Sequence, residues 1–540
     1  MHSNVTKNCM MDIIIGLINS IGRTGIVIVL LSLLYWYIRT KYSYWKQKGI
    51  DGPPVIPFLG NFFLPHKPVA LLHQDYVRRY GKFFGMYQGR KPMLCIADPV
   101  IIKRILVQDF PMFRNRIKQT TRHKIFSQNL VNARDESWKR IRSILSPMFT
   151  SSKMKKMEGM IDQCADSMIQ VFGKLADKQE SFLVHGVMGN FTMDVIAKCA
   201  FATDTNAHND KENIFVQNAR SFFNFNLFRM LLLIITPSAL IQLFAKSKIP
   251  PYYSKTADFF MNMSSHVIKQ RRENKTKQCD DMLQLMIKAE HAKEKSFEKE
   301  DAIDSHHVNQ GEEEIYQEEE IFREIIGSKY LNEEEIIAQS MVFLLAGYET
   351  TASTLTFCMY ELAKHPNIQN KLYDEIKTII DRGETLDFNN IMKLPYLDAV
   401  ISETLRKHPP ALLLSREAME EYHIPEYKYT LEKDEAITIP VYAIHHDPEY
   451  YPNPETFNPD RFMPENRHNI VPYTYLPFGG GPRNCIGMRF ALSEAKLGLA
   501  NLLKNFIIIA TDKTCDRLQV EKSLFLMKTT PIYVGVKRRI

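Results

Sequence analysis

A mostly apolar run at residues 336–345, preceded by a helix-start signal, is the sequence feature that most constrains the fold. Asn332 is followed by three glutamates, and an Asn with Glu335 three positions later forms a capping box, which begins a helix. The helix that follows is apolar nearly all round until Gly347, so it is expected to run through the interior. The chain must therefore surround one long helix with other apolar elements.

The composition supports a single large domain. The chain has 540 residues, of which 45% are hydrophobic and 24% charged, with no internal repeat and no flexible linker after residue 61. Helical patterns dominate, and the strand-like pieces at 436–444 and 531–538 are short, so the predicted fold is mainly α with a small β portion. The net charge of +8 comes without a Lys/Arg block, which argues against nucleic-acid binding.

Cysteine usage indicates a reducing compartment. The eight cysteines are scattered, with no CxxC pair, which argues against a disulfide framework and against zinc or iron–sulfur sites.

The amino terminus predicts a retained membrane anchor. Residues 13–38 are apolar except for a few positions, with Arg23 as the weak point, and an aromatic belt at 35–37 precedes Arg39 and Lys41. These basic residues predict that the following chain is cytosolic. A cleaved signal peptide is the competing interpretation, but no A-x-A-like site follows. The predicted division is a lumenal tail and anchor at 1–48 and a cytosolic domain at 49–540, joined by a Pro/Gly-rich, stiff spacer.

Two further stretches stand out by composition. Residues 222–244 are apolar almost throughout, and they are expected to form either core helices or a substrate-pocket lip that dips into the membrane. Residues 290–335 are dense in Glu and Lys and predict a solvated surface loop with some helix and no chemistry of its own.

Polar residues inside the long helix could carry chemistry. In one interpretation Thr350 bonds back to the Ala346 carbonyl and Glu349 reaches a basic partner. In the other, Gly347 opens room beside the helix while Glu349 and Thr350 bring protons into a pocket. The sequence alone leaves both open.

Cys485 stands in a glycine-rich loop, FGGGPRNCIG. The loop lacks the Lys-Ser/Thr ending of a phosphate loop, and no Ser/Thr/Cys–His–acid grouping is legible nearby. Arg483, backbone amides and a following helix start are all expected to favour a thiolate. A thiolate held in an apolar surround suits an axial ligand of haem iron. The favoured interpretation is therefore a metal ligand.

The motifs together resemble the cytochrome P-450 monooxygenases. Phe478, Gly481, Arg483, Cys485 and Gly487 match the FxxGxRxCxG haem signature, and residues 346–351 match the oxygen-activation motif. Glu403 and Arg406 would be an ordinary surface pair by spacing alone, but they resemble the family's ExxR pair, with Arg461 as its third member. Trp138 and Arg142 match its WxxxR element. The motifs occur in family order, with wording similar to that of the animal microsomal drug- and steroid-oxidising enzymes.

The resemblance implies a single P-450-type helical haem domain, preceded by the transmembrane helix, with haem b (iron protoporphyrin IX) as cofactor. Cys485 would be the iron ligand. The implied haem contacts are Trp138, Arg142, Arg416, Phe478, Arg483 and, as a weaker candidate, Arg116. Thr350 would steady the bound dioxygen and Glu349 would supply protons. Glu403, Arg406 and Arg461 would form a buried network. The chain departs from the family pattern at Asp460, which stands in place of the more usual Glu, and in its longer acidic insertion before the long helix. Neither difference affects the implied chemistry.

The implied activity is insertion of one oxygen atom from O2 into a lipophilic substrate, namely a steroid, fatty acid or xenobiotic. Electrons would come from an NADPH-dependent P-450 reductase, with cytochrome b5 as a second donor, at the cytosolic side of the endoplasmic reticulum membrane. The alternatives are a haem-thiolate isomerase or dehydratase and a non-catalytic haem binder, both disfavoured by the acid–threonine pair. Expected pocket contributors are 117–130, 222–244 and 411–415.

Overall fold

The computed structural model describes residues 24–539 except 63, 65, 119–124, 209, 211, 224–231, 234–235, 237, 248, 250–253, 274–280, 290–329 and 524–525. Residues 13–23 of the predicted anchor, most of the acidic stretch 290–335 and parts of the predicted pocket segments 117–130 and 222–244 therefore lie outside the described residues.

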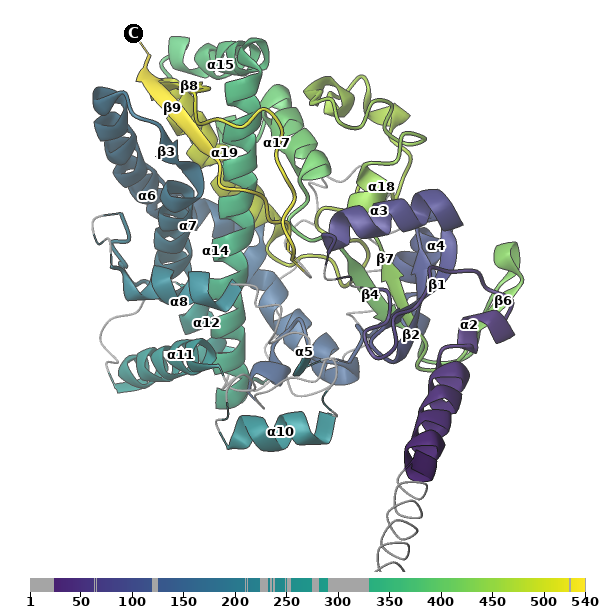
Figure 1. Cartoon of the computed structure of the whole chain (residues 1–540). Coiled ribbons are helices and arrows are strands. Elements are labelled where there is room, and N and C mark those ends of the chain that lie inside the picture. Colours follow the sequence, from purple (N-terminus) through teal and green to yellow (C-terminus); the bar gives the residue numbers. More distant parts are fainter. Residues whose placement is uncertain are drawn as a thin grey trace, which may run out of the picture.

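The predicted interior helix is α14 (Glu333–Lys364), which runs through the centre of the molecule (Figure 1). Its capping box is present: the Asn332 side chain accepts from the Glu335 N–H at 2.8 Å, and the Glu335 carboxylate accepts from the Asn332 N–H at 3.0 Å. Side chains are buried along most of its length. The sequence prediction of a buried, capped helix is confirmed.

Helices make up most of the fold, and many of them share one large hydrophobic core with α14. The main helices of the fold, whether or not they belong to this core, are α3 (Val69–Tyr80), α5 (Asp135–Leu145), α6 (Ser151–Lys178), α7 (Val184–Phe201), α8 (Ile214–Phe223), α10 (Ser238–Lys246), α11 (Lys255–Glu273), α12 (Met282–Ala289), α15 (Pro366–Asp381), α17 (Pro395–Lys407) and α19 (Met488–Asn505).

The β portion is small, as predicted. The largest sheet has the order β1-β2-β7-β4, formed by β1 (Phe83–Gln88), β2 (Lys91–Ile96), β7 (Ala436–Ile439) and β4 (Leu414–Glu417). β2 and β7 are parallel, and β4 runs antiparallel to β7 with Arg416 opposite Ile437. A second sheet joins β3 (Phe182–Leu183), β9 (Tyr533–Arg538) and β8 (Phe506–Ile509), and β5 (Tyr422–Ile424) pairs with β6 (Tyr429–Leu431). The largest sheet has its own hydrophobic core.

The described part of the predicted anchor is a helix at Thr24–Lys41 that protrudes from the body of the protein (Figure 1). Within the described residues it is the one helix long and apolar enough to cross a membrane, and none of it is buried. The short helix α2 (Tyr44–Gln47) follows and docks on β1. There the Trp45 indole N–H donates to the Met86 carbonyl at 2.9 Å, so the anchor continues directly into the folded domain.

Candidate functional site

The residues before Cys485 form a tight loop that presents the thiol just ahead of α19. The Cys485 N–H donates to the Phe478 carbonyl at 2.9 Å, and the Asn484 N–H donates to the Gly481 carbonyl at 2.9 Å. Gly481 has a φ of +67°, and a Cβ there would stand 1.8 Å from the Leu106 carbonyl oxygen. The glycine is therefore required by backbone conformation and by close approach of a neighbouring segment.

Cys485 is an exposed residue, and the protein atoms around its sulfur nevertheless raise the pKa of the thiol by burial. The Gly487 N–H and the charges of Arg142 and Arg116 act in the opposite direction and lower that pKa. The sequence pointed to Arg483 as the cation that favours the thiolate. In the structure, two arginines from distant parts of the chain act on the sulfur instead.

Arg483 belongs to a neighbouring network. Its guanidinium donates to the backbone carbonyls of Arg114 and Ala133, and it lies 4.9 Å from the centre of the Trp138 ring. The stacking on an indole and the two carbonyls hold the side chain in one place. Trp138 thus contacts the predicted haem-binding arginine directly.

Several arginines gather here, and among the described residues neither Arg416 nor Arg483 forms an ion pair with a carboxylate. Burial, followed by the charge of Arg116, lowers the pKa of Arg416 to about 9. Burial, followed by the charges of Arg116, Arg416 and Arg134, lowers that of Arg483 to about 8. The Glu417 carboxylate is paired with Lys91 at 3.0 Å and with Arg134 at 2.8 Å.

Among the described residues, the Nε atoms of Arg416 and Arg483 are buried and have no hydrogen-bond partner. Like charges in a protein interior repel one another, and a bound anion would relieve that repulsion. The donor set therefore fits a ligand that carries carboxylates, such as the two propionates of a haem.

Helix α5 ties this region to the cysteine loop. Trp138 and Arg142 are one helical turn apart and both are buried. The Arg142 guanidinium donates to the Asn484 carbonyl at 3.0 Å and to its Oδ1 at 2.6 Å. The sequence analysis did not single out Asn484 as a site residue. Its position directly before the cysteine was the one signal that could have identified it.

Helix α14 has a small open face within its buried length. Ala346 is exposed and Thr350 is partly exposed, although Leu345, Tyr348 and Glu349 are buried. The Thr350 hydroxyl donates to the Ala346 carbonyl at 2.7 Å. This back-bond leaves the oxygen's acceptor sites available on the open face.

Two other residues of this motif face α7. A Cβ on Gly347 would meet the Ile196 side chain at 3.0 Å, so this glycine permits close helix packing. That contact differs from the expectation that Gly347 opens a space. Glu349 is buried and lies 3.4 Å from His185 Nε2. His185, the basic partner anticipated for Glu349, could not be identified from the sequence.

Glu403, Arg406 and Arg461 form the implied buried network. The Glu403–Arg406 pair is fully buried, with hydrogen bonds of 2.7 and 2.8 Å. Arg406 also donates to the His445 carbonyl at 2.9 Å, and Arg461 approaches Glu403 at 3.6 Å. The i, i+3 spacing of Glu403 and Arg406, which is typical of exposed pairs, therefore does not indicate an exposed pair at this position.

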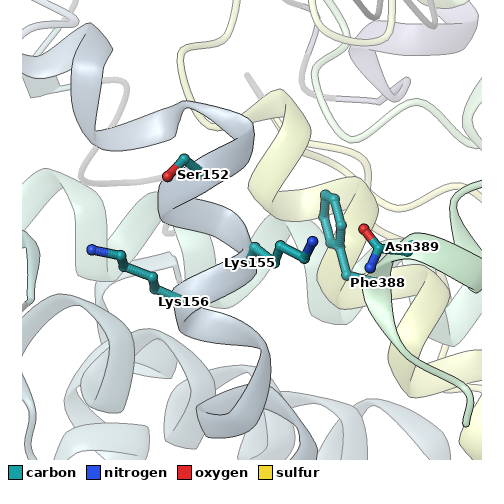
Figure 2. A pocket seen from close by; sticks show the side chains of 5 residues that line it. All are labelled: Ser152, Lys155, Lys156, Phe388 and Asn389. Atoms are coloured by element: carbon teal, nitrogen blue, oxygen red, sulfur yellow. The ribbon is translucent and has the colours of Figure 1, made fainter. Parts of the chain in front are cut away.

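A separate pocket lies on the surface between α6 and the short helix α16 (Phe388–Ile391), where Lys155 and Phe388 face each other (Figure 2). It is open to solvent and contains none of the predicted site residues. The cysteine loop and α14 therefore remain the functional candidates.

The structure thus gathers Phe478, Arg483, Arg142, Arg116 and Trp138 around the Cys485 loop. Arg416 joins the same charged group. Thr350 and Glu349 lie on α14, which packs against α19. A cysteine in a glycine-rich loop, a group of buried arginines suited to carboxylates and an acid–threonine helix in a mainly helical domain together fit a haem-thiolate protein.

Comparison with known proteins agrees with this class. The family model described as Cytochrome P450 matches residues 50–536. Cytochrome P450 3A16 of Mus musculus is 35% identical over 96% of this chain and 97% of its own length. Cytochrome P450 3A9 of Rattus norvegicus is 35% identical over 95% of this chain and 96% of its own. Lithocholate 6-beta-hydroxylase of Mesocricetus auratus is 33% identical over 95% of this chain and 96% of its own length.

The chain belongs to the cytochrome P450 family. It is a P450 monooxygenase of the animal microsomal type, with a haem-iron cofactor, a redox partner and lipophilic substrates. Its apolar N-terminal helix and its microsomal relatives indicate a membrane-anchored protein.

Proposed function

We propose that this protein inserts one oxygen atom from O2 into steroid-like or similarly lipophilic substrates, with Cys485 as the axial ligand of an iron protoporphyrin IX. The haem supplies the oxygen activation, and the protein residues hold it and control protons. The observation that carries the proposal is the exposed Cys485 thiol beside buried arginines that lack a carboxylate partner among the described residues.

The haem propionates would be bound by the arginine group and by Trp138. Arg416, Arg483 and Arg116 repel one another, so two carboxylates would relieve that repulsion and form charge-assisted hydrogen bonds. Arg142 would contribute to haem binding by holding the cysteine loop in place through its hydrogen bonds to Asn484. Phe478 accepts the Cys485 N–H at its carbonyl and packs against the core.

Thr350 and Glu349 would manage protons. The Thr350 oxygen lies on the open face of α14, where it would accept and pass on a hydrogen bond near the oxygen-binding position. Glu349, close to His185, would connect the interior to a half-buried basic side chain. This arrangement supports oxygen chemistry, because an isomerase or a simple haem binder has no use for it.

The substrate class is proposed from a relative and from surface chemistry. One relative is named for hydroxylating lithocholate, a steroid acid. Leu240 and Leu243 on α10 are exposed, and α10 lies on the side of the molecule toward which the anchor helix protrudes (Figure 1). A membrane-facing apolar surface favours substrates that are dissolved in lipid.

The proposed setting is the endoplasmic reticulum, with a single transmembrane helix and a cytosolic domain at 49–540. The basic residues after the anchor support this orientation. An NADPH-dependent P450 reductase, aided by cytochrome b5, would supply two electrons per turnover.

The test is turnover of a steroid and xenobiotic panel in vesicles with purified reductase and NADPH. We expect product only when reductase, NADPH and O2 are all present, with one labelled oxygen from 18O2 in the product. Product formed without O2 would support an isomerase or dehydratase. Activity without the reductase would contradict the proposal that a separate reductase supplies the electrons.

A further inference from the structure

The side chain of Glu494 is a buried acid that the proposed mechanism does not use. It lies on α19 and is 0% exposed. Neither of its carboxyl oxygens has a hydrogen-bond partner among the residues that the structure describes. Burying an unpaired carboxylate is far more costly than burying a neutral acid.

Thr351 on α14 has a complementary feature. Three neighbouring threonines, Thr350, Thr354 and Thr356, donate to the carbonyl four residues earlier, at 2.7, 2.9 and 2.6 Å. The Thr351 hydroxyl is buried and makes no such bond within the described part of the chain. It is therefore the threonine of this group whose hydroxyl remains available to another helix.

The two groups lie on helices that pack against each other. α14 and α19 are in contact, and Figure 1 shows α19 beside α14. Burial raises the pKa of Glu494 well above its usual range, and the Thr351 hydroxyl acts on this carboxyl in the opposite direction.

Among the described residues, the ionisable groups around Glu494 offer it no counter-charge. Cys164 on α6 and Cys199 on α7 are thiols whose own pKa values are raised, first by burial. Lys198 is 2.9 Å from Asp204, and Lys496 on α19 is 2.8 Å from Asp398 on α17.

We propose that Glu494 is a positioning residue: an uncharged carboxylic acid that binds the Thr351 hydroxyl and fixes α14 against α19. A neutral acid has one O–H donor and can also accept, as can a threonine hydroxyl, so the pair satisfies both groups. α14 carries Thr350 in the adjacent position, and α19 starts three residues after Cys485. The pair therefore links the helix of the oxygen-side threonine to the helix that follows the sulfur ligand.

The direct test is infrared difference spectroscopy on the full-length protein at neutral pH, with Glu494→Gln. We expect wild type to show the carbonyl stretch of a protonated carboxyl group, shifted in D2O and missing from the variant. Thr351→Val should move this band without abolishing it, because the acid loses its partner but stays buried. Thr356→Val, at a buried threonine bonded within its own helix, is the matched control and should leave the band unchanged.

The functional test rests on the proposed monooxygenase activity and compares product formed per NADPH consumed. Glutamine can still donate to Thr351, so Glu494→Gln should stay within about twofold of wild type, whereas Glu494→Leu and Thr351→Val should each lower coupling by ~fivefold or more. The double variant should be no worse than the poorer single variant, because both remove one interaction.

Absence of a Glu494-dependent protonated-carboxyl band would overturn the proposal. An equal loss of coupling in Glu494→Gln and Glu494→Leu would overturn it as well. Failure of the monooxygenase function itself would instead remove turnover from wild type and leave the infrared result intact. If Glu494→Leu does not fold, the infrared band of wild type and its loss in Glu494→Gln still test the proposal.

Discussion

The Arg142 guanidinium binds Asn484 at two atoms, the carbonyl oxygen at 3.0 Å and Oδ1 at 2.6 Å. Asn484 directly precedes Cys485, so this contact fixes the loop that presents the thiol. Burial raises the pKa of that thiol, and the charge of the same arginine opposes this rise. One side chain therefore positions the sulfur and also favours its ionised form.

Arg142→Lys is expected to weaken haem retention. Lysine keeps the charge but lacks the planar fork that reaches both atoms of Asn484. We expect haem loss to an excess of apomyoglobin to be about tenfold faster, which corresponds to ~1.4 kcal/mol. Lys139→Arg on the same helix, at a residue paired outward with Glu136, is the control. An unchanged loss rate in Arg142→Lys would show that the two-atom contact is dispensable.

Arg406→Ala is expected to destabilise the fold severely. The substitution leaves the Glu403 carboxylate fully buried without its partner, a loss of about 3–5 kcal/mol. The comparison is Lys371→Ala, which breaks an exposed pair with Asp460 worth ~0–1 kcal/mol. Urea unfolding midpoints and the yield of folded protein measure the difference. Similar midpoints for both variants would disprove the buried network as a main source of stability.

Thr350→Val is expected to uncouple electron use from oxygenation. Valine has the shape of threonine but lacks the hydroxyl on the open face of α14. Product formation should fall by about tenfold or more, equivalent to ~1.4 kcal/mol of transition-state stabilisation, while NADPH consumption continues and peroxide accumulates. Thr350→Ser should keep most of the coupling. Coupling unchanged in the valine variant would remove Thr350 from proton control.

The sequence predicted the features that local patterns determine. The α14 capping box and the buried helix follow from adjacent residues, and both are confirmed. The apolar piece 436–444 reads as one strand, yet β7 ends at Ile439 and Pro440 leads into the short helix α18 (Val441–His445). Proline lacks the N–H that a continuing strand would use.

Spacing alone could not predict the tertiary contacts. The Glu403–Arg406 spacing is typical of exposed pairs, and the buried network with Arg461 was expected only from the family resemblance; the structure adds the His445 carbonyl as a further partner of Arg406. The contacts Arg142–Asn484 and Glu349–His185 join residues far apart in the chain. Spacing carries no information about such pairs.

Gly85→Ala is expected to loosen the link between anchor and domain. A Cβ at this position would stand 2.3 Å from the Trp45 ring, so the indole would have to move at a cost of ~1–3 kcal/mol. Faster proteolysis after Lys46 and Lys48 in vesicles measures this loosening. Gly159→Ala, where nothing lies near the added carbon, is the control. Equal cleavage of both variants would contradict direct docking of Trp45 on the sheet.

The central claim, thiolate ligation of haem iron by Cys485, is tested most directly by the reduced carbon-monoxide difference spectrum of wild type and Cys485→Ser. We expect the red-shifted Soret band of a thiolate-ligated haem in wild type and its complete loss in the serine variant. The same band in Cys485→Ser, or a wild-type protein that binds no haem, would contradict the account.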